Sequence, residues 1–197
     1  MNSLKNTFSD RDLVEAGVDE AGRGCLAGPV CVAAVILPND IEVPSSIKIR
    51  DSKKMTALQR TKSAEWIKTN CLAYTTYMVE VDIIDRVNIL QASLWGMTQA
   101  VARLDIQPEL ILIDGPHYHP PDDTEYHCII KGDGTYLSIA AASIIAKTTR
   151  DDFMVKLHIE YPEYCWNMNK AYGTRLHKEA IREHGLCVHH RKSFKTG

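Results

Sequence analysis

Apolar runs in the first part of the chain predict buried strands. Residues 13–19 indicate a first strand, and residues 29–37 form a continuous apolar run rich in β-branched side chains, the pattern of a central strand. The glycine-rich segment between the two runs predicts a turn through which the strands pair. Alternation and β-branched residues predict three more strands, at residues 71–81, 109–113 and 126–130.

Four segments with apolar residues near helical spacing predict helices between and after these strands. They cover residues 57–69, 88–104, 137–160 and 175–184, and Thr56 is a suitable N-cap for the first. The first half of 137–160 is small and apolar on almost every side, so we expect it to be buried. The order of elements predicts an α/β fold with one mixed five-stranded sheet, helices flanking the sheet and a C-terminal helical segment.

Charge is unevenly distributed along this chain of 197 residues, although its net charge is only −2. Residues 166–197 contain seven Lys and Arg but only two Asp and Glu, whereas residues 1–165 carry a net charge of −7. A basic segment on an acidic body suits a surface that binds a polyanion, and a solvated tail is the alternative. No linker or repeat divides the chain. We therefore expect residues 1–197 to form one catalytic domain, with the basic segment contributing to substrate binding.

The N-terminal residues and the cysteines bear on where the protein works. Residues 1–12 are polar and contain no apolar stretch typical of a secretion signal, so a cytoplasmic protein is expected. Six scattered cysteines without a Cys-x-x-Cys pair indicate free thiols. No apolar run is long enough to span a membrane. We expect a monomer without a membrane partner.

Acidic residues stand at the ends of three predicted strands. Asp19 and Glu20 end the first strand, Asp114 follows the fourth and Asp133 lies just after the fifth. One such acid is usually a turn residue, but four carboxylates on adjoining strand ends would form a strongly negative patch. Neighbouring strand residues point to opposite faces, so Asp19 and Glu20 both reach the patch only if the strand ends or bulges there. Mg²⁺ or Mn²⁺ would neutralise the patch, and carboxylates that bridge two such ions suit phosphodiester cleavage.

A series of motifs resembles ribonuclease HII, in the order of that family and over nearly the whole chain. The motifs are GVDEAGRG at 17–24, DSKK at 51–54, IDG at 113–115, KGD at 131–133, AAASIIAK at 140–147 with TRD at 149–151, YGT at 172–174 and HHRKSF at 189–194. The resemblance implies an RNase H-like fold and an endonuclease that hydrolyses the RNA strand of RNA/DNA hybrids. It further implies cleavage 5′ of single ribonucleotides in duplex DNA, 5′-phosphate and 3′-hydroxyl ends, and roles in ribonucleotide and primer removal.

The same resemblance implies a role for individual residues. It places the catalytic metal ligands at Asp19, Glu20, Asp114 and Asp133, with Mg²⁺ or Mn²⁺ as cofactor and two ions in the catalytic complex. It places substrate contacts at Gly22, Arg23, Gly24, Lys53 and Tyr172. The glycine-flanked turn would read the ribonucleotide 2′-hydroxyl, which distinguishes RNA from DNA. Tyr172 would pack on the junction sugar, and Lys53 would lie near substrate phosphates.

Other polar residues are expected to have structural roles. Asp151 is interpreted as a structural partner of Lys147, one helical turn away, or of Arg150. Ser143, inside an alanine run, is interpreted as a helix-packing residue. His189 and His190 are expected to contact phosphate or to be solvated, with a metal or proton-shuttle site as the alternative.

Three other functions are weighed against this hypothesis. Ribonuclease HIII has an additional N-terminal domain, which is not expected here because only eighteen residues precede Asp19. A non-catalytic hybrid-binding protein is expected to lack one of the four carboxylates. A nuclease for DNA junctions would not need the turn at 22–24 with Tyr172. Two positions depart from the family pattern: Ala171 stands where glycine is frequent, and Gly134 where a larger residue is commoner.

Overall fold

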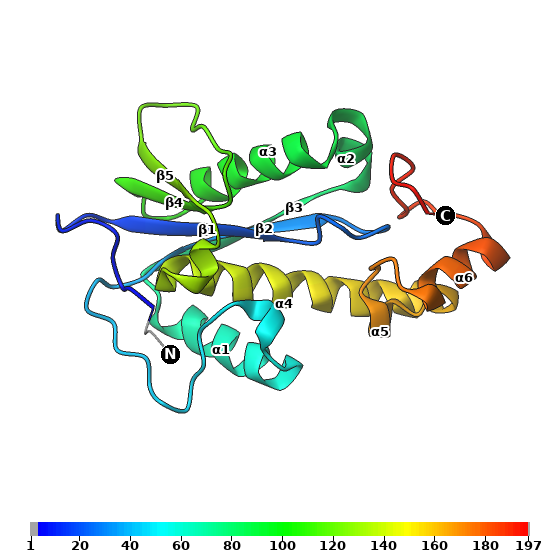
Figure 1. The fold of residues 1–197 in the computed structure, drawn as a ribbon, viewed down its shortest axis with the longest axis horizontal. Coiled ribbons are helices and arrows are strands. Elements are labelled where there is room, and N and C mark those ends of the chain that lie inside the picture. The colour runs from blue at the N-terminus through cyan, green and yellow to red at the C-terminus, as the bar shows by residue number, and fades with distance from the viewer. Residues whose placement is uncertain (1–3, 197) are drawn as a thin grey trace.

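A mixed five-stranded sheet lies at the centre of the protein, and the computed structural model describes residues 4–196 (Figure 1). The strands are β1 (Glu15–Ala21), β2 (Val30–Ile36), β3 (Ala73–Val79), β4 (Leu110–Asp114) and β5 (Glu125–Ile129). Their order in the sheet is β3-β2-β1-β4-β5. β2 is antiparallel to β1, as predicted, and to β3, whereas β4 is parallel to β1 and to β5. The predicted mixed sheet is confirmed.

Helices cover both faces of the sheet (Figure 1). One face carries α2 (Val81–Val87) and α3 (Ile89–Ala102), and the other carries α1 (Ala57–Asn70) and α4 (Leu137–Glu160). The far end of α4 packs against α5 (Trp166–Asn169), with α6 (Arg175–His184) beside it. Short 3₁₀ helices are η1 (Ser52–Lys54), η2 (Gly132–Gly134) and η3 (Pro162–Tyr164). Within residues 4–196, every helix is too short or too polar to cross a membrane.

The sheet is buried from both sides, as the continuous apolar run of β2 predicted. Cys31, Ala33 and Val35 pack with residues of α1 and α4. Val32, Ala34 and Ile36 pack with residues of α3. The alternation of strand side chains therefore supplies two cores, and the functional residues must lie at the ends of the strands.

The helix α4 approaches β1 closely because Gly17 has no side chain. A Cβ atom there would lie 2.2 Å from the carbonyl carbon of Ser138 and 2.3 Å from the nitrogen of Ile139. Ser143 follows Ile139 by about 6 Å along the helix, and Asp19 follows Gly17 by about 7 Å along the strand. The close approach thus brings Ser143 next to Asp19.

The first strand begins and ends two residues later than predicted. We expected it to end at Asp19, but β1 continues to Ala21, which still pairs with Cys31 of β2. On the other side, pairing with β4 stops at Val18 and Ile113. The predicted end was wrong because only one of the two neighbouring strands leaves β1 at this point.

Candidate active site

The carboxyl ends of β1, β4 and β5 adjoin at one edge of the sheet. Asp114 is the last residue of β4, and Asp133 lies in η2, directly after β5. Lys131 adopts a left-handed conformation with φ 59°, which turns the chain back toward β4. The backbone N–H of Gly132 then donates a hydrogen bond of 2.8 Å to Oδ1 of Asp114. Two of the predicted acids are therefore joined through a single turn.

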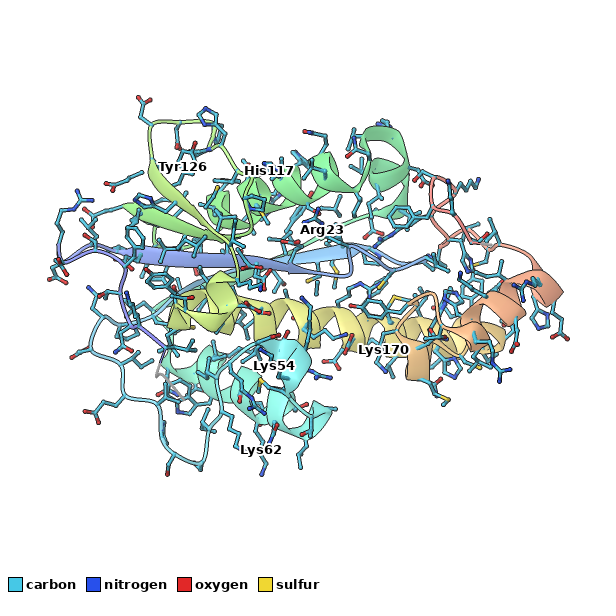
Figure 2. The ribbon with its side chains drawn as sticks, in the orientation of Figure 1. Arg23, Lys54, Lys62, His117, Tyr126 and Lys170 are labelled. Carbon is cyan, nitrogen blue, oxygen red and sulfur yellow. The ribbon has the colours of Figure 1, made fainter. Side chains whose placement is uncertain are left out.

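Asp19 and Glu20 lie just beyond the point where β4 separates from β1. Asp19 is on the α4 face of the strand, is only 6% exposed, and accepts the Glu20 N–H at 2.6 Å. Glu20 is on the opposite face, where its Oε1 accepts a hydrogen bond of 3.1 Å from Arg23. Figure 2 shows Arg23 on the α3 side of the sheet and Lys54 on the α1 side. The two carboxylates thus flank the strand from both faces, and β1 neither ends nor bulges between them.

Burial and nearby charges raise the pKa of three of these carboxyl groups. Burial raises the pKa of Asp19 well above its usual value, and the charges of Glu20 and Asp114 raise it further. Burial also raises the pKa of Glu20, although Arg23 opposes this rise. Burial, followed by the charge of Asp114, raises the pKa of Asp133. Such a group of buried acids requires a positive counter-charge in order to stay ionised.

The chemistry of the site fits a divalent cation. All four predicted ligands offer carboxylate oxygens, which Mg²⁺ and Mn²⁺ prefer. Oε2 of Glu20 is buried and has no hydrogen-bond partner among residues 4–196, so it is an acceptor that a cation would satisfy. In that same part of the chain, no three Asp, Glu, His or Cys side chains are grouped closely enough to hold one ion. Because like charges repel, we expect the carboxylates to close in only around a bound cation. Their assignment as ligands stays a prediction.

The DSKK segment lies beside these acids. Lys53 is near enough to Glu20 and Asp133 for its charge to oppose the rise that burial causes in their pKa values. Oγ of the preceding Ser52 is 3.0 Å from Oγ of Ser143, and both residues are buried. The interpretation of Ser143 as a packing residue was incomplete. A buried hydroxyl in an apolar helix needs a partner, and that signal could have revealed it.

The turn that follows β1 requires glycine at position 22. Gly22 has φ 98°, and a Cβ atom there would lie 2.0 Å from Nε of Arg150. Arg150 is fully buried in α4, and its guanidinium donates to the carbonyls of Ala27, Pro29 and Lys170 at 2.9–3.0 Å. The guanidinium occupies the space that a side chain at position 22 would need. Arg150 was expected only as an alternative partner of Asp151, whereas its guanidinium binds these three carbonyls.

Tyr172 lies against the same connection, where it forms an isolated antiparallel bridge with Cys25. Its side chain is partly exposed, and Nζ of Lys147 lies 5.2 Å from the ring centre. Lys147 also donates a hydrogen bond of 2.7 Å to Asp151, which confirms the expected structural role of that acid. Burial raises the pKa of Tyr172 to about 12, so its phenol stays protonated at neutral pH. Tyr172 borders a hollow of about 530 Å³ whose basic lining residues are Arg60, Lys147 and Lys170.

The two departures from the family pattern have different structural settings. Ala171 is fully buried with φ 65°, a conformation that suits glycine and costs an alanine roughly 1–2 kcal/mol. Its N–H donates 2.8 Å to Oδ1 of Asn169, which helps to hold that conformation. At Gly134 a Cβ atom would meet nothing within 4 Å, so the fold accepts a larger residue there.

A buried pair of histidines supports the backbone of Tyr172. Nε1 of Trp166 donates to Nε2 of His177 at 3.1 Å, so the proton of His177 is on Nδ1, where it donates to the Tyr172 carbonyl at 3.1 Å. Nε2 of His190 lies 3.2 Å from Nε2 of His177, and Nδ1 of His190 accepts the Cys187 N–H at 3.0 Å. This network requires both rings to be neutral. The expectation of phosphate contact or solvation was wrong for His190, because it is fully buried.

The histidine pair makes a prediction about stability and pH. Burial lowers the pKa of His190 to about 4, and burial also lowers the pKa of His177. The unfolded chain, with an ordinary histidine pKa of about 6.5, binds protons more readily than the folded protein in this window. Stability from the pair is therefore full above pH ~6.5 and is lost as the pH falls toward 4. Urea unfolding between these pH values should show a steeper loss for the wild type than for His190→Gln, and equal pH dependence would contradict the network.

Comparisons with known proteins agree with the resemblance of the motifs. The sequence profile of a family described as Ribonuclease HII matches residues 16–197. Ribonuclease HII of Bacteroides thetaiotaomicron is 50% identical over 187 residues, which cover 95% of this chain and 92% of that protein. Ribonuclease HII of Porphyromonas gingivalis is 45% identical over 192 residues, covering 98% and 94%. The crystal structure of ribonuclease H2 from Pyrococcus horikoshii superposes with a TM-score of 0.78 at 27% identity, covering 92% of this chain and 94% of that one. The chain therefore belongs to the ribonuclease HII family and is a metal-dependent ribonuclease H with the RNase H-like fold.

Proposed function

We propose that this ribonuclease H cleaves on the 5′ side of single ribonucleotides in duplex DNA, as well as within the RNA strand of longer hybrids. Action on RNA/DNA hybrids belongs to its family. The position of the cut, the 5′-phosphate and 3′-hydroxyl ends and the use of two divalent ions are our proposal. The cellular roles that follow are removal of misincorporated ribonucleotides and of RNA primers, carried out by a monomer.

One observation carries this proposal: the turn that would read the sugar directly follows the acids that would cut the phosphate. Gly22 comes two residues after Glu20, and Tyr172 bridges to Cys25 at the end of the same turn. The 2′-hydroxyl and the 5′-phosphate belong to one nucleotide. The residues that bind the hydroxyl and the acids that act on the phosphate must therefore be close neighbours. A rigid turn attached to the catalytic strand meets this requirement.

The residues of the site then have distinct tasks. Divalent ions held by Asp19, Glu20, Asp114 and Asp133 would activate the attacking water and stabilise the leaving oxygen. Lys53, beside these acids, contacts a substrate phosphate. The basic residues of segment 166–197 add affinity that depends on salt and not on sequence. The protein therefore selects the sugar and not the base.

Two other functions fit the structure less well. A binding protein without activity would not need four mutually repelling carboxylates, which destabilise the fold when no cation is present. A nuclease for DNA junctions would gain nothing from a glycine turn next to the acids. Neither alternative accounts for Gly22 with its left-handed backbone and for the buried oxygen of Glu20 together.

The test of this function is a matched pair of duplexes that differ by a single 2′-hydroxyl. With Mg²⁺ or Mn²⁺, the duplex with one ribonucleotide should be cut once, on its 5′ side, and the all-deoxyribose duplex should stay intact. End labelling should detect a 3′-hydroxyl on one fragment and a 5′-phosphate on the other. Cutting of the all-deoxyribose duplex would show that the 2′-hydroxyl is not read.

Tyr172 offers a second test of sugar recognition. Tyr172→Ala removes the ring that packs on the junction sugar. We expect kcat/KM on a single-ribonucleotide duplex to fall about tenfold or more, which is the loss typical of removing one aromatic stacking contact with a nucleotide. The decrease should be at least as large as on a continuous hybrid. Tyr172→Phe is the control, because it keeps the ring and should retain most of the activity. Unchanged rates of Tyr172→Ala on both substrates would exclude the ring from the site.

A further inference from the structure

The C-terminal segment is bound to the turn and is not a free tail. Arg191 is fully buried, and its backbone N–H donates to the Leu26 carbonyl at 2.9 Å. Its guanidinium reaches further: Nη1 donates to the carbonyl of Arg23 at 2.9 Å, and Nε donates to the carbonyl of Gly28 at 3.0 Å. A residue near the C-terminus therefore holds both ends of the β1–β2 connection, on the side opposite to solvent.

The contact with Arg23 fixes the direction of one peptide group. In a trans peptide the carbonyl and the following N–H point in opposite directions. Because the carbonyl of Arg23 points inward to Arg191, the N–H of Gly24 points outward. Gly24 is exposed, and a Cβ atom there would meet nothing within 4 Å. Within residues 4–196 no acceptor receives this N–H, so it is available to a ligand.

The residues that follow Arg191 are anchored to α2. Asp85, at the surface of α2, accepts hydrogen bonds from the N–H groups of Lys192 and Ser193 at 3.0 Å and from the Ser193 hydroxyl at 2.6 Å. The Phe194 ring centre lies 5.0 Å from the guanidinium carbon of Arg191. The planar guanidinium holds its N–H donors in a fixed geometry and so orients two carbonyls at once, whereas the ammonium of a lysine carries rotating donors on a flexible stem.

We propose that Arg191 is a positioning residue for ribonucleotide selection, because it fixes the Arg23–Gly24 peptide and so presents the Gly24 N–H to the substrate 2′-hydroxyl. This inference rests on the proposed function, in which the turn at 22–24 reads that hydroxyl. It adds the device that orients the reader. The bond that selects the sugar thus depends on a side chain about 170 residues away along the sequence.

The experiment measures the preference of the protein for a ribose over a deoxyribose. Binding of a duplex with one ribonucleotide and of its all-deoxyribose counterpart is measured by fluorescence anisotropy, in an Asp19→Asn background so that neither strand is cut. The readout is the ratio of the two dissociation constants. Arg191→Lys keeps the positive charge but loses the planar set of N–H donors. We expect the ratio to fall about three- to tenfold, the effect of losing one hydrogen bond from the Gly24 N–H to the 2′-hydroxyl. Arg103→Lys makes the same exchange at an exposed position that directly follows α3, outside segment 166–197, and should leave the ratio unchanged.

The possible outcomes separate this inference from the proposed function. A change in folding alone would weaken the binding of both duplexes by the same factor and leave the ratio of their dissociation constants unchanged. If the Asp19→Asn protein prefers the ribose-containing duplex and Arg191→Lys leaves that preference unchanged, the role of Arg191 is overturned, but the reading of the 2′-hydroxyl is not. Equal binding of both duplexes by the background protein overturns that reading, and this inference with it. If Arg191→Lys does not fold, the ratio is measured on Asp85→Ala, which frees residues 192–193 from an exposed anchor; an unchanged ratio there also overturns the proposal.

Discussion

Asp19→Asn is expected to abolish cleavage while leaving the protein as stable as the wild type, or more stable, in the absence of metal. The substitution removes one of four clustered negative charges at a position that is nearly inaccessible to solvent. Loss of an electrostatic contribution of this kind lowers turnover by on the order of 10³-fold. Burial and the neighbouring acids raise the pKa of Asp19, so its ionised form opposes folding at neutral pH. A neutral amide removes that opposition.

Cleavage rates and thermal unfolding, each with and without Mg²⁺ or Mn²⁺, test this prediction. The wild type should gain thermal stability from the cation because binding favours the folded state, and Asp19→Asn should gain much less. Asp105→Asn is the matched control, because Asp105 is exposed in the loop before β4, at the other end of that strand from Asp114. Near-normal turnover by Asp19→Asn would remove Asp19 from the catalytic group.

Gly22→Ala is expected to have the second largest effect, on both stability and sugar recognition. The new methyl group would meet Arg150, whose buried guanidinium already has three carbonyl partners and little room to move. The backbone conformation at φ 98° adds strain for any side chain. Together these effects should cost about 1–3 kcal/mol of folding free energy. Cleavage of a single-ribonucleotide duplex should fall with them, because the turn can no longer keep its shape.

Gly24→Ala provides the matched control for the stability of the turn. A methyl group at that position would enter open space, so the unfolding free energy should stay near the wild-type value. Urea unfolding of the two variants therefore separates the effect of the close contact at Gly22 from a general destabilisation of the turn by alanine. Equal stability of Gly22→Ala and the wild type would mean that Arg150 does not brace the turn as described.

The sheet and the main helices could be predicted because local patterns determine them. The apolar run of β2 indicated a strand buried on both faces, and helix α4 has the bounds that its pattern predicted. The sequence also indicated that the acidic strand ends lie side by side. Asp114 ends β4, Asp133 follows β5, and these two strands are neighbours in the sheet. The end of β1 could not, because it depends on two partner strands that leave it at different residues.

The buried side-chain contacts that hold the site in place could not be predicted from the sequence, because they join segments that are far apart in the chain. Arg150 and Arg191 looked like ordinary basic residues, yet both are fully buried and bind carbonyls of the β1–β2 connection. His190 lies in a basic segment, which indicated solvation, but its partner His177 comes from the neighbouring helix α6. Ser143 has its hydroxyl partner Ser52 some ninety residues earlier in the chain. A single sequence can indicate that a buried polar group needs a partner, but it does not show which residue the partner is, because these side chains meet only after folding.

The most direct test of the central claim is cleavage of a duplex with one embedded ribonucleotide, by enzyme stripped of metal with a chelator and then titrated with Mg²⁺ or Mn²⁺. The claim is that four carboxylates need divalent cations in order to cut where an adjacent turn reads a ribose. We predict no cleavage before the metal is added, and a single cut 5′ of the ribonucleotide once it is present. Cleavage in the presence of chelator, or metal-dependent cuts at positions without a ribose, would contradict this account.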